Sequence, residues 1–262
     1  MIKIEKGERD PEFLKMRDVF LDEICEPVEL YSEMFCMRAP PYFFIKDGER
    51  IGYVLFGEDN AIHEFYIRNE YVPLAPEVFK RFLEEYPVEK AIVQSWDHHF
   101  MTMCLLHFSK KKVLGFNFRD RVAEFGPFEK FEFRERRATM EDHDLILKHR
   151  EGIFDDTEVK HIPFWIRKSE IIIFENDRDE FIGYGLLNRT LESRDWFDVG
   201  MYVHPDHRKM GIGAWIIDNL VQRCLEREWR PVAGCAVSNT GSKRTLEKAG
   251  FVSKHVIVEF WD

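Results

Sequence analysis

The sequence predicts an α/β protein whose strands form a mixed sheet, and three observations lead to this class. Short β-branched and aromatic runs are bounded by turn residues, which is typical of strands. These runs alternate with stretches of helical periodicity, which favours an α/β fold over an all-α or all-β one. A strand–turn–strand pattern occurs in each half of the chain, so two units of similar order are expected.

The second half gives the clearest series of elements. Residues 128–134, 171–174, 181–187, 196–203, 232–237 and 252–260 are expected to be strands, and residues 140–150 and 239–248 helices. After Gly211, apolar residues recur at helical spacing at Ile212, Trp215, Ile216, Leu220, Cys224 and Leu225. This stretch is expected to be an amphipathic helix that covers a sheet. Gly250 suits the end of the helix before it.

The first half repeats this order in a weaker form. Ile51-Gly52-Tyr53 occupies the same place in its hairpin as Ile182-Gly183-Tyr184 does in the other. A chance similarity of two hairpins is the alternative, but the order of the following elements also agrees, which favours an internal duplication. We therefore expect one domain at residues 1–129 and a second at residues 130–262, joined near residues 124–130.

Composition excludes several classes of protein. The net charge is −10, and neither half is basic, so the chain offers no general surface for nucleic acid or an anionic membrane. No apolar stretch reaches the roughly 20 residues of a membrane span, and the charged start is unlike a signal peptide. Five widely spaced cysteines are interpreted as reduced core residues rather than disulfides or metal ligands. A cytoplasmic monomer or homodimer is expected.

The segment from Val203 to Gly213, VHPDHRKMGIG, carries the most specific chemistry. A strand ends there, the chain turns, and a helix begins at two glycines. Glycine lets backbone N–H groups approach an anion closely, and a helix N-terminus adds partial positive charge. Arg208 and Lys209 add full positive charges at the same place. The segment therefore predicts a phosphate-binding loop.

This loop resembles the acyl-CoA pyrophosphate loop of the GNAT acetyltransferase superfamily, whose pattern is V-x-P-x-x-[QR]-x-x-G-x-[GA]. Val203, Pro205, Arg208, Gly211 and Gly213 match that pattern. Residues 239–251 resemble the family's second segment, N-x-x-[AS]-x-x-L-Y-E-K-x-G-F. The resemblance is clear over residues 130–262 and faint over 1–129, where residues 67–73 have no glycine and carry an acid. One cofactor site is expected, after a degenerate GNAT-like domain.

The resemblance implies the fold of that family, with acetyl-CoA as acyl donor and no metal. Acetyl-CoA would enter between the strand that ends at Val203 and the strand at residues 232–237, which splay apart. The residues implied in cofactor binding are Met201, Tyr202, Val203, Arg208, Lys209, Met210, Gly211, Ile212, Gly213, Ala214, Asn239 and Ser242. Asn239 is also a candidate helix N-cap. Lys243 and Arg244 are either contacts of the ribose phosphate or solvated surface.

The expected reaction is direct attack of a primary amine, of a small molecule or a peptide, on the thioester. Asp198 is either the base for the ammonium proton or a solvent-facing polar residue of an alternating strand. The family's tyrosine, the usual acid, is Leu246 here, so Tyr202, Tyr184 or water would protonate the thiolate. Leu246 favours one alternative, a non-catalytic acyl-CoA binding or sensing module. Among enzymes, an acyltransferase that uses a longer acyl-CoA or a hydroxyl acceptor also stays open.

Residues near the middle of the second half occupy the place where the family has its acceptor-side helices. The aromatic and acidic residues there are Phe154, Asp155, Asp156, Glu158, His161 and Trp165. They form either a wall for a cationic amine or an ordinary amphipathic helix. His98 and His99 are interpreted as loop histidines rather than metal ligands or a base.

Overall fold

The computed structural model describes residues 2–122, 131–154, 156 and 158–262. The contacts between residues divide the chain into two compact units, and each unit is made of more than one segment of the sequence. Residues 2–117, 236–238 and 255–262 belong to the first unit, and Phe118–Cys235 and Asn239–Lys254 to the second. The C-terminal end of the chain is therefore part of the first unit. The predicted join near residues 124–130 lies outside the described residues, and the division at residues 129 and 130 stays a prediction.

The first unit contains a mixed sheet in the order β1-β2-β3-β4-β5-β12. Its strands are β1 (Ile2–Lys6), β2 (Pro41–Lys46), β3 (Glu49–Phe56), β4 (Ala61–Ile67), β5 (Lys90–Gln94) and the end of β12 (Phe251–Trp261). Only the β4–β5 pair is parallel among these; Ile257 to Phe260 of β12 pair antiparallel with β5. β6 (Lys110–Arg121) begins in this unit.

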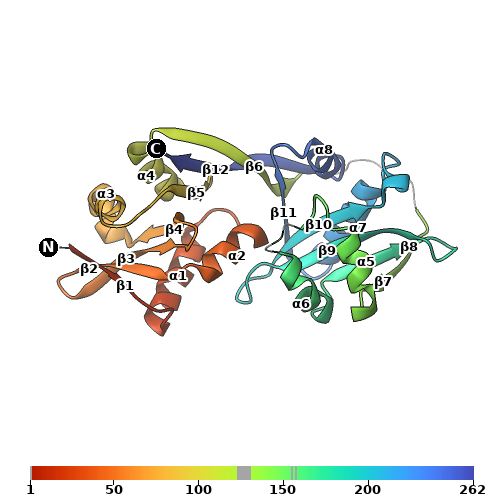
Figure 1. Ribbon diagram of the computed structural model, residues 1–262, viewed down its shortest axis with the longest axis horizontal. Coiled ribbons are helices and arrows are strands. Elements are labelled where there is room, and N and C mark those ends of the chain that lie inside the picture. Colours follow the sequence, from red (N-terminus) through yellow and green to blue (C-terminus); the bar gives the residue numbers. More distant parts are fainter. Residues whose placement is uncertain (1, 123–130, 155, 157) are drawn as a thin grey trace. The chain divides into compact units, whose positions relative to one another are not determined.

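Helices cover both faces of that sheet (Figure 1). They are α1 (Pro11–Glu23), α2 (Leu30–Arg38), η1 (Asn69–Leu74), α3 (Ala75–Glu85) and α4 (His98–His107). Phe65 of β4 packs edge-on against Phe79 of α3, with ring centroids 5.2 Å apart. Tyr53 points to the opposite face, where it meets Phe13 of α1 at 5.0 Å. The strand alternation therefore divides an aromatic core between two helical layers.

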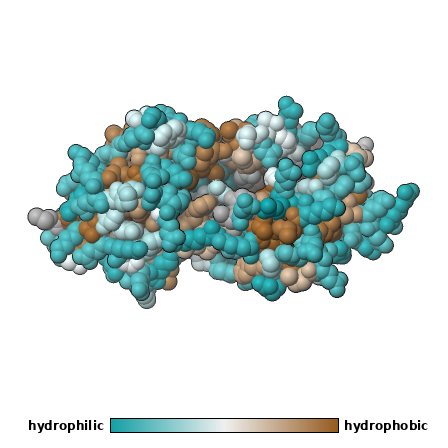
Figure 2. Space-filling view, in the orientation of Figure 1, coloured by the Kyte–Doolittle hydropathy of each residue, from teal (hydrophilic) through white to brown (hydrophobic). Residues whose placement is uncertain are grey.

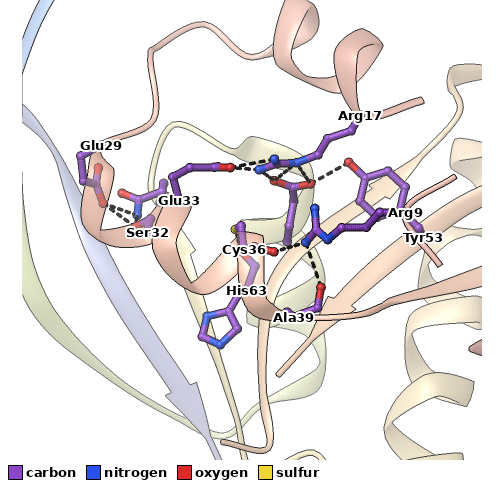
Figure 3. A network of polar contacts seen from close by, with 11 residues as sticks. Arg9, Arg17, Glu29, Ser32, Glu33, Cys36, Ala39, Tyr53 and His63 are labelled. Atoms are coloured by element: carbon purple, nitrogen blue, oxygen red, sulfur yellow. Dashed lines mark hydrogen bonds and ion pairs between the residues drawn. The ribbon is translucent and has the colours of Figure 1, made fainter. Parts of the chain in front are cut away.

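A buried ion network joins the helical layer of α1 and α2 to β4 (Figure 3). The Arg17 guanidinium donates to both carboxylate oxygens of Glu33, at 2.8 and 2.6 Å, and to Glu64, at 3.0 Å. The Tyr53 hydroxyl donates to Glu64 as well, at 2.7 Å. Burial alone would lower the pKa of Arg17, but the charges of Glu64 and Glu33 raise it well above its ordinary value. The guanidinium therefore stays charged between two carboxylates.

The second unit has the sheet order β7-β8-β9-β10-β11, in which only β10 and β11 pair in parallel. Its strands are β7 (Arg134–Arg137), β8 (Ile171–Glu175), β9 (Phe181–Arg189), β10 (Trp196–Val203) and β11 (Arg230–Ala236). Its helices are η2 (Met140–Asp142), α5 (His143–Lys148), η3 (Val159–His161), α6 (Ile162–Arg167), η4 (Pro205–His207), α7 (Ile212–Leu225) and α8 (Thr240–Lys248).

Helix α7 packs on one face of β9 and β10, and α5 and α6 lie on the other (Figure 1). Gly185 permits the close approach of α7, because a Cβ atom there would lie 3.0 Å from Leu220 and 3.3 Å from Ile216. The buried face of α7 also includes Ile212 and Cys224, as the helical spacing predicts. The two faces of β10 therefore meet different helices.

Several sequence predictions need correction. The strand expected at residues 128–134 begins only at Arg134, and residues 128–130 lie outside the described part. Leu225 is 52% exposed, because it lies about 100° around α7 from the buried Cys224. Cys25 is exposed rather than part of the core. His98 and His99 are not loop residues: they begin α4, whose N-cap is Asp97.

The duplication is visible in matching backbone contacts of the two hairpins. Tyr53 of β3 pairs with Tyr66 of β4, and Tyr184 of β9 pairs with Tyr202 of β10. The N–H of the residue that follows β4 donates to Ile51, and the N–H that follows β10 donates to Ile182, both at 2.8 Å. The two units therefore share the same strand register. A chance similarity of two short motifs would not by itself produce this agreement.

Hydrophilic residues predominate on the face shown in Figure 2, with apolar residues in smaller areas. This distribution agrees with a chain of which 33% is charged. Among the described residues, no helix combines the length and the apolar character needed to cross a bilayer.

Candidate active site

The edge of β10 that faces β11 is open over half of its length. The two strands pair from Trp196 opposite Arg230 to Asp198 opposite Val232. β10 then continues to Val203 while β11 continues to Ala236, and the described register contains no further pairs between them. Backbone groups of an extended ligand can bind such an edge as another strand would.

Strand register decides which backbone groups face this edge. The N–H of His204 donates to Ile182 of β9 at 2.8 Å, so even-numbered residues of β10 bond to β9. The N–H and C=O groups of Met201 and Val203 consequently point to the open edge. Tyr202, the third residue proposed here from the sequence, directs its backbone groups to Tyr184 of β9 instead.

The loop after β10 leaves the start of α7 uncapped. Lys209 and Gly211 both have left-handed backbone conformations, with φ of 67° and 89°. Gly211 is the N-cap of α7 and has no side chain that could accept a hydrogen bond from the first turn. The first N–H groups of a helix have no partner within it, so those of Ile212, Gly213 and Ala214 are directed at the space before the helix. This arrangement fits an anion such as pyrophosphate.

Positive side chains surround the loop. The Nε of Arg208 donates to the carbonyl oxygen of Val203 at 3.0 Å, which leaves the rest of its exposed guanidinium for a ligand. Lys209 and Met210 are exposed as well. Gly213 lies against α8, because a Cβ atom there would be 3.0 Å from the Thr245 side chain. The loop is therefore charged and held closely by its neighbouring helix.

Helix α8 begins beside the end of β11. The Asn239 side chain accepts the N–H of Ser242 at 3.0 Å, so the N-cap predicted for Asn239 is confirmed. Lys243 forms an ion pair with Glu247 one turn along the helix, at 2.5 Å. Leu246 is 1% exposed and packs in the core, so the position of the family's tyrosine carries no polar group.

On the face of β10 that is turned away from α7, aromatic rings form a continuous layer. Tyr202 stacks on Tyr184 at 5.2 Å, Tyr184 on Phe154 at 6.1 Å, and Phe154 on Trp165 at 5.4 Å. His161 adjoins Trp165 at 5.9 Å. The residues expected to form either a wall for a cationic amine or an ordinary amphipathic helix thus include Phe154 and Trp165, which pack in a buried aromatic layer against β9 and β10. Burial raises the pKa of Tyr184 far above its ordinary value, so its hydroxyl stays protonated.

The acids predicted near this wall do not form one cluster. Asp156 pairs with Arg150 at 2.8 Å, and Asp155 lies outside the described residues. Asp198 is half-buried and shares the face of Tyr202, but the two residues are about 13 Å apart along the strand.

His149 was missed by the sequence patterns. It is the C-cap of α5, and its Nδ1 lies 2.9 Å from the Tyr202 hydroxyl. The Tyr184 hydroxyl donates to its backbone carbonyl at 3.0 Å. Burial lowers the pKa of His149, with smaller contributions from the charges of His204 and Lys148. Lone histidines carry no local signal, so only the fold could identify this contact.

The first unit has the same splayed strands but no loop of this kind. β4 and β5 pair only from Ala61 opposite Lys90 to Ile62 opposite Ala91. η1 runs directly into α3, whose first turn contains Pro76, which has no N–H, and the acidic Glu77. An anion would find fewer donors and a repulsive charge there. Among the described residues of both units, no group of three or more potential ligands is arranged to hold a metal.

Two domain models match the chain. Residues 10–121 match an acetyltransferase (GNAT) domain, and residues 132–251 match the acetyltransferase (GNAT) family. A curated relative, the uncharacterized N-acetyltransferase YjdG of Bacillus subtilis (strain 168), is 30% identical over 113 residues. That match covers 42% of this chain and 64% of the relative, so the chain spans less than two thirds of its length.

Solved structures resemble the whole chain. A GNAT-family acetyltransferase from Colwellia psychrerythraea superposes with a TM-score of 0.88 at 17% identity, and the match covers 99% of both chains. A tandem GNAT protein from the clavulanic acid biosynthesis pathway gives a TM-score of 0.60 at 11% identity, over 99% of this chain and 98% of that one. At these identities the likeness concerns the fold. With a GNAT domain matched in each half, the chain belongs to the GNAT acetyltransferase superfamily and carries two of its domains in tandem.

Proposed function

We propose that the second unit transfers an acetyl group from acetyl-CoA to a primary amine of a small molecule or a peptide. The open edge of β10, which leads to the uncapped N-terminus of α7, carries this proposal. Met201 and Val203 would bind the pantetheine arm through their backbone. The N–H groups of the loop and of α7, with Arg208 and Lys209, would bind the pyrophosphate.

Donor and acceptor would then meet beside β10. A backbone N–H of the open edge would stabilise the developing oxyanion of the thioester carbonyl. Asp198 would take a proton from the incoming ammonium group, directly or through water, and release a neutral amine. Tyr202 would act nearer the cofactor loop than Asp198, because the residues before and after it, Met201 and Val203, supply the backbone groups of the open edge. Asn239 and Ser242 would lie at the thiol end.

A release assay for free CoA thiol tests this function. The protein is incubated with acetyl-CoA and a panel of small primary amines and peptides, with propionyl-CoA as a second donor to test acyl length. Turnover that requires an amine supports the proposal. Loss of CoA binding in an inactive loop variant connects that turnover to this site.

A second function is favoured by one observation. Leu246 is buried where the family has a tyrosine, so the thiolate has no hydroxyl donor at that position. A non-catalytic acyl-CoA sensor would tolerate this change. Micromolar CoA binding without turnover on any amine would select this alternative. The proposal also includes a cytoplasmic location, which the five free cysteines favour, and a monomeric or homodimeric state.

A further inference from the structure

The Tyr202 hydroxyl and the His149 imidazole form a hydrogen-bonded pair between β10 and the end of α5. The Nδ1–Oη distance is 2.9 Å, and Tyr202 is 6% exposed. The two residues are 53 positions apart in the sequence, so the fold alone brings them together. A buried polar pair of this kind needs well-defined geometry, because each group depends on the other for its hydrogen bond.

Neighbouring rings fix the orientation of both side chains. The imidazole stacks on Phe181 at 5.2 Å and meets His204 nearly edge-on, also at 5.2 Å. Tyr184 stacks on Tyr202 and donates its hydroxyl to the backbone carbonyl of His149. The hydrogen bond is therefore preorganised, and neither partner must lose rotamer freedom when a substrate binds.

The pair lies close to the proposed donor edge. Tyr202 stands between Met201 and Val203, whose backbone groups face the space between β10 and β11. The Arg208 guanidinium carbon is 5.7 Å from the centre of the Tyr202 ring, and its Nε bonds to Val203. A group bound at the open edge through Met201 or Val203 would thus lie about one residue's length along β10 from Tyr202. The Tyr202 side chain points to the face with the aromatic layer.

The surroundings of the imidazole favour its neutral form. Burial lowers the pKa of His149, and positive charge on His204 and Lys148 lowers it further. The titratable and charged groups that face the pair are Tyr184, His204, Lys148 and Arg208. A neutral ring protonated at Nε2 accepts the hydroxyl proton of Tyr202 at Nδ1, which leaves the tyrosine oxygen lone pairs for another proton.

We propose that His149 is a positioning residue that makes Tyr202 a proton relay for the acceptor amine. This inference rests on the acetyl transfer proposed above. The amine nitrogen forms a bond to the thioester carbonyl carbon, and the C–S bond breaks. As the nitrogen loses its N–H proton to the Tyr202 oxygen, the hydroxyl proton of Tyr202 passes to Nδ1 of His149. The imidazolium returns this proton to water, and the thiolate takes one from water.

Five variants and one pH series test the relay. Tyr202→Phe and His149→Ala should each lower kcat by roughly 10²-fold. CoA affinity should stay unchanged, because the open edge would bind CoA through backbone groups of Met201 and Val203, and neither substitution removes these groups. The double variant should be no slower than either single one, since the two groups act as one unit. His143→Ala, at the other end of α5, is the matched control and should keep wild-type kcat.

The pH profile separates proton transfer from simple support of the fold. Wild-type kcat should fall at acid pH, with a midpoint below about 6.5, the ordinary pKa of histidine, because burial lowers the pKa of His149 and the protonated ring cannot accept a proton. In His149→Asn the amide can still bond to Tyr202 but does not titrate, so this acid limb should disappear.

Two results would overturn the relay while wild-type turnover persists: full kcat in both single variants, or multiplicative losses in the double variant. Absence of wild-type turnover on any amine, with CoA bound, would overturn the acetyl transfer and the relay together.

Discussion

A Cβ atom on Gly183 would lie 2.2 Å from the carbonyl oxygen of Tyr202, a distance that no side chain can accept. Gly52 has the same relation to Tyr66 in the first unit, at 2.3 Å. Both glycines therefore exist because a neighbouring strand passes too closely for any larger residue. The same steric requirement has survived in both copies of the domain, although the loop that we propose to bind phosphate occurs in only one of them.

Gly183→Ala should push β9 from β10 and destabilise the second unit by about 1–3 kcal/mol. CoA binding should weaken with it, because the open edge belongs to β10. Gly52→Ala is the matched control: it should lower stability to a similar degree and leave CoA affinity intact. Urea unfolding and calorimetric titration with CoA measure the two effects. Equal CoA affinity in both variants would contradict the proposed role of β10.

Gly211→Val should abolish CoA binding, because it places a β-branched side chain in the loop at a left-handed position. Gly48→Val is a close control, since Gly48 has a φ of 86° and also has open space around its Cβ position. Each variant should cost about 1–3 kcal/mol of backbone strain, so their unfolding midpoints should fall similarly. Unchanged CoA binding by Gly211→Val would refute the assignment of the loop.

Asp198→Asn should lower kcat/KM near neutral pH by roughly 10²-fold, since the amide cannot remove the ammonium proton. The deficit should shrink as the pH approaches the pKa of the amine, where the neutral amine is already present in solution. A rate profile over this pH range measures the effect. Wild-type activity of the variant at neutral pH would show that Asp198 is not the base.

Arg17→Met should destabilise the first unit by about 3–5 kcal/mol, because it leaves Glu33 and Glu64 buried without their cation. Adding Glu33→Gln and Glu64→Gln should restore part of that loss, since the uncompensated charges disappear. Lys80→Met, which removes the exposed Lys80–Glu84 pair, should have little effect on unfolding. Similar losses for the buried and the exposed pair would argue against this account.

Asp97 gives the first unit a pH dependence of known sign. Burial raises the pKa of its carboxyl group to about 7, although the N–H of Phe100 opposes the change. The native state therefore binds the proton more readily than the unfolded state between about pH 4 and pH 7, so stability falls as the pH rises through this window. Asp97→Asn keeps an acceptor for the helix cap and removes the titration.

Urea midpoints of the two proteins at about pH 5 and pH 8 measure this effect. The wild type should lose more stability than Asp97→Asn between the two values. An equal loss in both would assign the pH dependence to other groups.

Local patterns in the sequence predicted much of the second unit. The strand at residues 196–203 and the cap at Asn239 follow from alternation, proline and side-chain capping, which act over a few residues. The contact of His149 with Tyr202 and the burial of Arg17 between two carboxylates depend on distant segments that only the folded chain brings together. Arg17 illustrates the limit, because a lone arginine in a charged helix is ordinarily expected at the surface.

The membership of residues 255–262 in the first unit has a consequence for how the protein is made. These residues are synthesised after residues 118–254, yet they supply the strand that pairs with β5. Until then the nascent first unit has β5 as an unpaired sheet edge, which is a site for association with other chains. The sheet of the first unit can therefore be completed only after residues 118–254 have been synthesised. Removal of residues 255–262 would therefore damage the sheet of the first unit, which also contains β1.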